Sequence, residues 1–245
     1  MIPLKDDAPL RRTPLITIAL IAANVAVFVW QIGIPGSLPR SVWILGLVPV
    51  DFLASLDPST WFRGGTEAPG LQSLQIPTIL TPLSSMFAHG SLMHIGSNML
   101  FLWVFGANVE DAMGKGRFVI FYLLCGLAAA AAQIGFAPGS DIPMVGASGA
   151  IAGMLGAYML LFPRARVLTL VPIFIFIRLM WLPAFLFLGL WFLLQIFGGL
   201  GTPGEGGGVA YWAHVGGFAA GLLLVRPFAG RIWRPRPRVR NVWYP

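Results

Sequence analysis

The sequence has few charged residues: aspartate, glutamate, lysine and arginine together make up 10% of its 245 residues. Hydrophobic residues make up 57%, and the mean hydropathy is +0.79. Soluble globular domains carry about 25% charged residues, so this shortage excludes an ordinary soluble domain. The composition predicts a polytopic membrane protein.

Cysteine is also nearly absent, because Cys125 is the only one in the chain. A single cysteine excludes an internal disulfide, and its place in an apolar run favours a packing role. The chain has three histidines, which without a cysteine cluster make no convincing zinc set. We therefore predict that neither a metal nor another cofactor takes part.

Long apolar runs, in contrast, are plentiful. A hydrocarbon core about 30 Å thick needs about 20 residues of helix to cross it. Six runs approach this length, at residues 14–34, 91–109, 117–136, 146–162, 180–199 and 209–227. Short connections between most of them favour antiparallel neighbours. The predicted fold is therefore all-α, a bundle of six transmembrane helices.

One further apolar segment, Val167–Leu179, is interrupted by Pro172 and Arg178. It either extends the fifth helix or lies in the membrane interface. The long first outer loop, from about Pro35 to His89, is expected to contain short interfacial helices. The sequence thus predicts one membrane domain between two tails, with bounds at residues 1–13, 14–227 and 228–245.

The basic residues are distributed unevenly between the two sides. If the amino terminus lies inside, 14 of the 16 lysines and arginines are on that side, and only Arg40 and Arg63 are outside. The positive-inside rule then places both termini in the cytoplasm. We expect a bacterial inner (plasma) membrane and a site that opens to the outer side. The basic tail is interpreted as an anchor on the lipid bilayer, with no nucleic acid as partner.

The first apolar run follows Arg11 and Arg12, as the core of a signal peptide would. It is, however, about 20 residues long, and no clear cleavage site ends it. We therefore interpret it as a membrane helix.

Polar side chains inside apolar runs are costly in lipid, and they tend to face a pocket. His94 and Asn98 lie four residues apart and therefore on one face of the second helix. Ser148 and His214 lie near the starts of the fourth and sixth helices, at a similar depth. Each residue alone would most often be a packing residue, but their common depth favours a shared site.

Small residues predict that the fourth and sixth helices approach closely. The spacing is small-x-x-x-small on both, at Gly149 and Gly153 and at Ala213, Gly217 and Gly221. This approach would bring the Ser148 hydroxyl within hydrogen-bond reach of His214, as nucleophilic catalysis requires. No acidic residue is placed to orient His214, so the expected arrangement is a dyad. The start of the fourth helix also offers free N–H groups to an oxyanion.

Three motifs together resemble the rhomboid intramembrane serine proteases: H-G-S-L-M-H-I-G-S-N at 89–98, G-A-S-G at 146–149 and A-H-V-G-G-F-A-A-G at 213–221. The resemblance covers roughly residues 80–225. It implies a six-helix bundle that cuts single-pass or otherwise membrane-anchored proteins in or beside their transmembrane segments.

The resemblance also implies roles for individual residues. Ser148 would be the nucleophile and His214 the general base and acid. His94, Asn98 and the Ser148 amide would form the oxyanion hole, and Gly146 would leave room for the oxyanion. Phe105-Gly106 and the stretch from Val109 to Arg117 resemble a structural turn of the family.

One departure lies in the first outer loop, where Trp61-Phe62-Arg63 is only a distorted match to the family's Trp-Arg element. His89 is interpreted as a loop-packing residue at the edge of the second helix. The alternative function is a non-catalytic rhomboid-like protein that binds client transmembrane helices, and the presence of both Ser148 and His214 argues against it. A transporter would be expected to show inverted repeats, which are not found.

Overall fold

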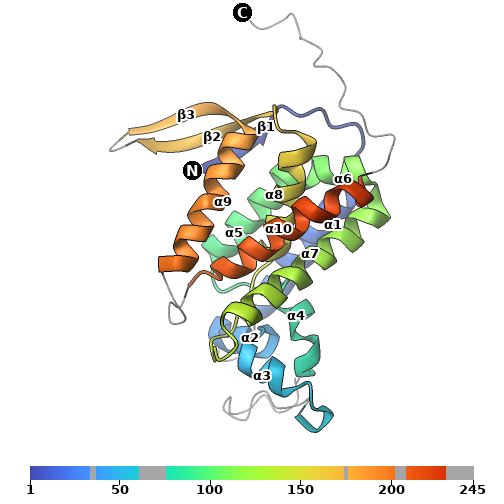
Figure 1. The fold of residues 1–245 in the computed structure, drawn as a ribbon, viewed down its shortest axis with the longest axis vertical. Coiled ribbons are helices and arrows are strands. Elements are labelled where there is room, and N and C mark those ends of the chain that lie inside the picture. Colours follow the sequence, from blue (N-terminus) through green and yellow to red (C-terminus); the bar gives the residue numbers. More distant parts are fainter. Residues whose placement is uncertain (34–36, 61–75, 174–175, 202–207, 230–245) are drawn as a thin grey trace, which may run out of the picture.

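The computed structural model describes residues 1–33, 37–60, 76–173, 176–201 and 208–229. In chain order the elements are β1 (Ile2–Asp6), α1 (Leu15–Gly33), α2 (Ser37–Leu45), α3 (Pro49–Ala54), the 3₁₀ helices η1 (Pro58–Thr60) and η2 (Thr78–Leu80), α4 (Thr81–Ser84), α5 (Leu92–Phe101), the π-helix η3 (Leu102–Gly106), α6 (Ala107–Met113), α7 (Lys115–Phe136), α8 (Ser148–Leu161), β2 (Arg166–Ile173), β3 (Phe176–Pro183), α9 (Ala184–Gly201) and α10 (Tyr211–Phe228). The longer helices form a bundle with a small sheet across one end and α2–α4 at the other (Figure 1).

The central helix of this bundle is α8. All of its residues from Gly149 to Tyr158 are buried, and it contacts α5, α6, α7, α9 and α10. A helix that is buried all round needs no amphipathic pattern, which agrees with its run of small and apolar residues. Ser148 begins this helix and Tyr158 lies in its last turn, so the two ends can be compared directly.

Glycines set the close contact between α8 and α10. A Cβ atom at Gly217 would lie 2.1 Å from the Gly149 carbonyl oxygen, and one at Gly221 would lie 1.9 Å from the Gly153 oxygen. A Cβ at Gly149 would in turn lie 2.5 Å from the Ala129 Cβ on α7. Side chains larger than hydrogen are therefore excluded here, and the predicted small-residue contact between the two helices is confirmed.

Within the described residues, four helical segments are long and apolar enough to cross a membrane: α1, Leu92–Met113, α7 and α9. The central α8 is a shorter apolar helix of 14 residues, and α10 has 18 residues with Arg226 and Pro227 in its last turn. Each of the six predicted apolar runs is helical over most of its length. The chain therefore fits a polytopic helical membrane protein.

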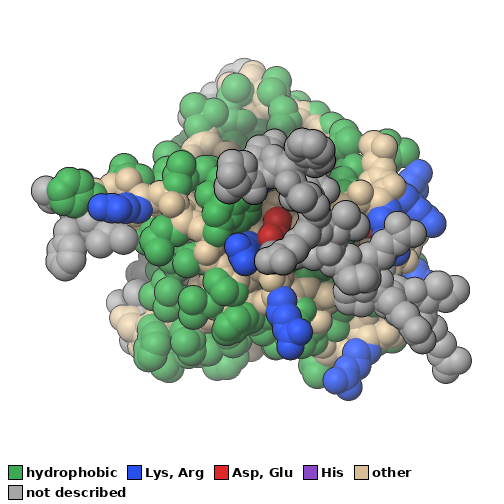
Figure 2. All heavy atoms as spheres, turned by 90° about the horizontal axis from the view of Figure 1, so that it is seen from above, with side chains coloured by type: hydrophobic (Ala, Val, Ile, Leu, Met, Phe, Trp, Pro, Cys, Tyr) green, Lys and Arg blue, Asp and Glu red, His purple; other side chains and the backbone are tan. Residues whose placement is uncertain are grey.

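The sheet end of the bundle carries many of the basic residues. Figure 2 looks onto this end and shows Lys and Arg side chains among a largely hydrophobic surface. The sequence places basic residues in β1, at the start of α7, between α8 and β2, in β3 and at the end of α10. In contrast, Arg40 lies on α2, at the opposite end of the bundle.

The all-α prediction is wrong for residues 166–173 and 176–183, which form the antiparallel strands β2 and β3 instead of a helix extension. The third strand, β1, pairs antiparallel with β2 and gives the order β1-β2-β3. Val167 and Thr169 are fully buried, while Ile177 and Leu179 on β3 are largely exposed. Both faces of the segment are apolar, so its sequence lacks the alternation of apolar and polar residues that indicates a strand.

The first strand is anchored to the bundle by Asp6. Its Oδ2 accepts a hydrogen bond from Asn108 Nδ2 at 2.8 Å and another from the Tyr158 hydroxyl. Burial raises the pKa of Asp6 from 3.8 to about 6, although the Tyr158 hydrogen bond acts in the opposite direction. The adjoining Asp7 exchanges backbone and side-chain hydrogen bonds with Arg166, which extends the pairing beyond β1.

The helix α6, which follows α5 and η3, supports the start of α1. The Glu110 carboxylate accepts hydrogen bonds from the Ile16 N–H at 3.0 Å and from the N–H and hydroxyl of Thr17, each at 2.8 Å. A carboxylate at a helix N-terminus satisfies amides that have no partner inside the helix. This agrees with the structural role expected for the turn.

The first loop contains the short helices α2, α3 and α4, as expected for part of this segment. This loop is bonded to the segment that precedes α8, because Leu47 and Met144 exchange backbone hydrogen bonds of 2.8 and 2.9 Å. The Ser85 carbonyl accepts a hydrogen bond from the Gly146 N–H at 2.8 Å. Trp61-Phe62-Arg63, the distorted match to a family element, lies outside the described residues.

Candidate active site

Ser148 lies at the point where an extended segment turns into α8. Gly146 has φ +123°, a conformation that residues with a side chain rarely adopt, and this allows the sharp turn into the helix. Ser148 is the first residue of α8, where backbone N–H groups have no partner inside the helix. The Ser148 hydroxyl therefore lies beside the positive end of the α8 dipole.

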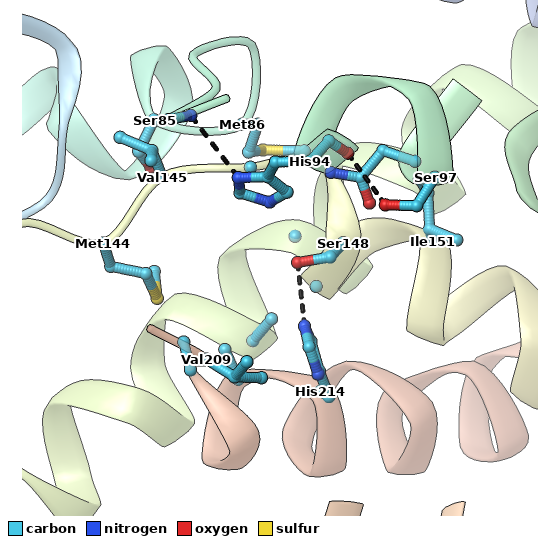
Figure 3. A pocket seen from close by; sticks show the side chains of 18 of the residues that line it. Ser85, Met86, His94, Ser97, Met144, Val145, Ser148, Ile151, Val209 and His214 are labelled. Atoms are coloured by element: carbon cyan, nitrogen blue, oxygen red, sulfur yellow. Dashed lines mark hydrogen bonds between the residues drawn. The ribbon is translucent and has the colours of Figure 1, made fainter. Parts of the chain in front are cut away.

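His214 faces Ser148 from the first turn of α10 (Figure 3). The distance between His214 Nε2 and Ser148 Oγ is 2.8 Å, which is that of a hydrogen bond. The close approach of the two helices at Gly149 and Gly217 makes this distance possible. The structure thus brings together the two residues that the sequence singled out for the dyad.

The other nitrogen of His214 contacts Gln195 on α9, with His214 Nδ1 and Gln195 Oε1 at 2.7 Å. The Gln195 amide nitrogen donates to the Trp191 carbonyl at 3.3 Å. Sequence reasoning missed Gln195, although it is a polar residue inside the apolar run 180–199. Applying the search for polar residues to every run would have found it.

His94 and Asn98 lie on α5, next to Gly146. A Cβ atom at Gly146 would lie 2.7 Å from His94 Nε2 and 3.5 Å from Asn98 Nδ2, so the missing side chain leaves space that both side chains border. The Gly90 N–H donates to His94 Nδ1 at 3.4 Å. In a neutral ring this places the proton on Nε2, the nitrogen on the Gly146 side.

The Asn98 amide supplies a second donor. Asn98 is 6% exposed, and its Nδ2 has no hydrogen-bond partner among the described residues. A buried donor without a partner is costly and therefore uncommon. Two donors on one helix thus border the space beside Gly146. Their spacing of four residues had predicted that they share one face of this helix.

These groups line one cavity of about 630 Å³. Its wall includes His94, Asn98, Gly146, Ser148 and His214. Apolar side chains complete the wall, among them Met86, Met93, Phe101, Met144, Trp191 and Val209. Such a cavity, apolar with a few convergent polar groups, is typical of a binding site.

His89 is fully buried and is not among the residues that line this cavity. Its backbone N–H donates to Gln31 Oε1 at 2.9 Å, and its carbonyl accepts from Gln31 Nε2 at 3.2 Å. Burial and the nearby His94 ring, whose centroid is 5.1 Å away, lower the pKa of His89 to about 4. These contacts agree with a packing role between the first loop, α1 and α5.

Within the described residues, no three His, Cys, Asp or Glu side chains are grouped so that they could hold a metal ion. The absence of a metal or cofactor from the reaction stays a prediction.

Comparison with known proteins gives the family. The sequence model of the Rhomboid domain matches residues 77–231, which is more than half of the chain. The chain therefore belongs to the rhomboid family. This confirms the resemblance that the three sequence motifs indicated.

Curated relatives agree with this assignment. "Rhomboid protein 1, mitochondrial" of Saccharomyces cerevisiae is 31% identical over 161 residues, 62% of this chain and 43% of the relative. "Presenilin-associated rhomboid-like protein, mitochondrial" of Homo sapiens is 29% identical over 231 residues, 92% of this chain and 51% of the relative. "Rhomboid protease GluP" of Bacillus subtilis is 41% identical over 81 residues, 33% of this chain and 15% of the relative. The chain spans about half, or less, of the length of these relatives.

The expectation of a bacterial inner membrane is contradicted by these relatives. The yeast and human proteins, which match over larger shares of this chain than the Bacillus protein does, are both named as mitochondrial. The physical reason for the error is that composition and charge asymmetry indicate how helices are oriented in a bilayer. Neither quantity identifies which bilayer contains them.

Proposed function

We propose that this chain is an intramembrane serine endopeptidase that uses Ser148 and His214 as a catalytic dyad. The observation that carries the proposal is the hydrogen bond of 2.8 Å between Ser148 Oγ and His214 Nε2, at the wall of a cavity in a rhomboid family member. A serine hydroxyl is a weak nucleophile, and it needs an adjacent base to accept its proton.

In the proposed reaction, His214 Nε2 accepts the Ser148 proton while Oγ attacks the scissile carbonyl carbon. His214 then gives this proton to the leaving amine, which departs as the peptide bond breaks. Water hydrolyses the resulting acyl-enzyme by the same proton transfers in reverse order. Each step therefore balances with His214 as the only proton carrier.

The developing oxyanion would be stabilised by three donors. They are the Ser148 N–H, His94 Nε2–H and Asn98 Nδ2–H, and the unoccupied donor of buried Asn98 supports this assignment. The space beside Gly146, which a Cβ atom would fill, is where we propose that the oxyanion lies. Donors preorganised in a water-poor site contribute strongly to catalysis.

We further propose that six helical segments span the membrane: α1, α5 through α6, α7, α8, α9 and α10. The substrates would be single-pass or otherwise membrane-anchored proteins, since the cavity lies at the start of a helix that is buried inside the bundle. The helix lengths and apolar surfaces support this proposal.

The test is labelling by a serine-directed fluorophosphonate in detergent micelles, together with cleavage of a single-pass reporter protein. We expect the native chain to be labelled and to cleave the reporter, and Ser148→Ala to do neither. The matched control is Ser55→Ala, because Ser55 is not among the residues that line the cavity and its hydroxyl donates to the Phe52 carbonyl of α3 at 2.7 Å. Equal labelling of native and Ser148→Ala protein would contradict the proposal. Folded native protein that bound the reporter helix without cleaving it would favour the non-catalytic alternative.

A further inference from the structure

The dyad has a third partner in this chain, an uncharged one. His214 Nδ1 lies 2.7 Å from Gln195 Oε1, on the side of the ring opposite Ser148. Serine hydrolases of the triad type have a carboxylate at this position. Within the described residues, no acidic side chain is hydrogen-bonded to this ring nitrogen.

The direction of the Gln195 amide is set by its second contact. Its nitrogen donates to the Trp191 carbonyl one turn earlier on α9, at 3.3 Å. The oxygen is therefore the atom that faces His214. An amide oxygen can only accept, so the hydrogen bond requires a proton on His214 Nδ1.

We infer that Gln195 is a positioning residue that fixes His214 in the tautomer with Nδ1 protonated. This inference rests on the proposed function of the dyad and adds a third member to it. With the proton held on Nδ1, the Nε2 lone pair faces the Ser148 hydroxyl and can accept its proton. The opposite tautomer would present an N–H to Ser148, and His214 would then be unable to act as base.

Two features suit a glutamine to this position. An amide carries no net charge, so it avoids the cost of a buried carboxylate. When His214 becomes positively charged during the reaction, its Nδ1–H donates more strongly to the same oxygen. Trp191, which lies on α9 like Gln195, packs beside the His214 imidazole. The centroids of the two rings are 5.8 Å apart.

The first test reads the tautomer without any reaction. Nitrogen-15 labelling of histidine gives ring signals from only three residues, and His214→Ala identifies the signals of His214. In the folded native protein we expect Nδ1 to carry the proton of the neutral ring. In Gln195→Leu, which has a side chain of similar size without an acceptor, we expect the second tautomer to appear. A native His214 with its proton on Nε2 would overturn the inference, even if no Gln195 variant folded.

The second test follows the rate of fluorophosphonate labelling and the turnover of the reporter. Misplacing a reacting group by about 1 Å costs about 10²-fold, so we expect Gln195→Leu to lower kcat by about 10- to 100-fold with little change in KM. Gln195→Glu restores an acceptor and should recover most of the lost labelling rate. Labelling by Gln195→Leu at the native rate would overturn the inference.

The matched control is Gln133→Leu, the same exchange at another glutamine that supports α10. Gln133 Oε1 accepts from the Ala213 N–H at 3.2 Å and caps the helix without being bonded to the His214 ring. This variant should lower the melting temperature but leave the His214 tautomer and the labelling rate per folded molecule unchanged. If Gln133→Leu changed the tautomer as much as Gln195→Leu, the effect would come from general loosening of α10, and the inference would be wrong.

The two proposals fail in distinguishable ways. If native protein neither labels nor cleaves but has Nδ1 protonated in a Gln195-dependent manner, the protease proposal fails while the role of Gln195 in setting the tautomer stands. If native protein labels and cleaves, and Gln195→Leu behaves like native protein in both tests, only the inference about Gln195 fails.

Discussion

The two ends of α8 hold polar groups in opposite ways. At its start, Ser148 and His214 border an open cavity, and the buried Asn98 donor has no partner within the described residues. Near its other end, the Tyr158 hydroxyl and Asn108 Nδ2 both donate to Asp6, and none of these three residues lines the cavity at Ser148. A hydrogen-bond donor that has no partner and borders a cavity is available to a ligand. A donor that is hydrogen-bonded inside the protein contributes to stability instead.

This comparison predicts that substitutions at the two ends separate activity from stability. Changes at the Ser148 end should lower activity with small effects on the melting temperature. Changes at the Tyr158 end should lower the melting temperature with small effects on the activity of each folded molecule.

The largest expected effect is the loss of the dyad. Ser148→Ala and His214→Ala should each lower turnover of the reporter by more than about 10⁴-fold, because neither residue can replace the other. The melting temperature of Ser148→Ala in the same detergent should stay close to the native value, because one hydrogen bond is lost. That of His214→Ala should fall by more, because the contacts of the ring with Gln195 and Trp191 are lost as well. Appreciable turnover by either variant at native expression would remove the catalytic assignment of this end of α8.

The next largest effect is expected at α5. His94→Ala and Asn98→Ala each remove one proposed oxyanion donor, which typically costs about 10²- to 10³-fold in turnover. Both variants should still be labelled by the fluorophosphonate, more slowly than native protein, because Ser148 and His214 remain. Ser55→Ala, which changes a serine away from the cavity, serves as control and should keep native turnover. Native turnover in both donor variants would show that the space beside Gly146 does not hold an oxyanion.

The difference between the two ends also explains what the sequence could predict. Ser148 and His214 are isolated polar residues in apolar runs, and small residues mark the contact between α8 and α10. These two patterns were enough to predict that Ser148 and His214 lie close together. The tautomer of His94 could not be predicted, because it depends on the Gly90 N–H, a backbone group without a sequence signature.

The hydrogen bonds at the Tyr158 end of α8 could not be predicted from the sequence. Asp6 lies in a short tail that was expected only to be cytoplasmic, and its partners are about 100 and 150 residues away. The sheet that brings it there pairs residues 2–6 with 167–170, a contact set by register between distant segments. Composition and local period carry no information on such pairing.

A pH series tests whether Asp6 is held in a buried site. The usual pKa is 3.8 and the folded-state pKa is about 6. Between pH 4 and 6 the Asp6 carboxyl therefore ionises in the unfolded chain while the folded protein keeps its proton, so stability falls as pH rises and the loss is complete above the folded pKa. Two pKa units correspond to about 3 kcal/mol.

The variant Asp6→Asn cannot ionise and isolates this effect. The melting temperature of native protein, measured relative to Asp6→Asn, should fall between pH 4 and 6 and then level off. Other carboxyl groups cancel in the difference. A difference that is constant from pH 4 to 7 would show that Asp6 is solvated in the folded protein.

The smallest expected effect, and the one that most directly compares the two ends of α8, is that of Tyr158→Phe. The change removes one hydroxyl that donates to the buried Asp6 and keeps the ring, which packs edge-on against Phe105 with centroids 5.0 Å apart. A hydrogen bond to a charged group contributes about 1.5–3 kcal/mol, and Asn108 still donates to Asp6, so we expect a loss of about 1–2 kcal/mol. The melting temperature in detergent should fall by a few degrees. The labelling rate of Ser148 per folded molecule should not change, because the hydroxyl lies at the other end of a helix that is packed on every side. A reduced labelling rate in folded Tyr158→Phe would show that the two ends of α8 are coupled, and the separation of activity from stability would then fail.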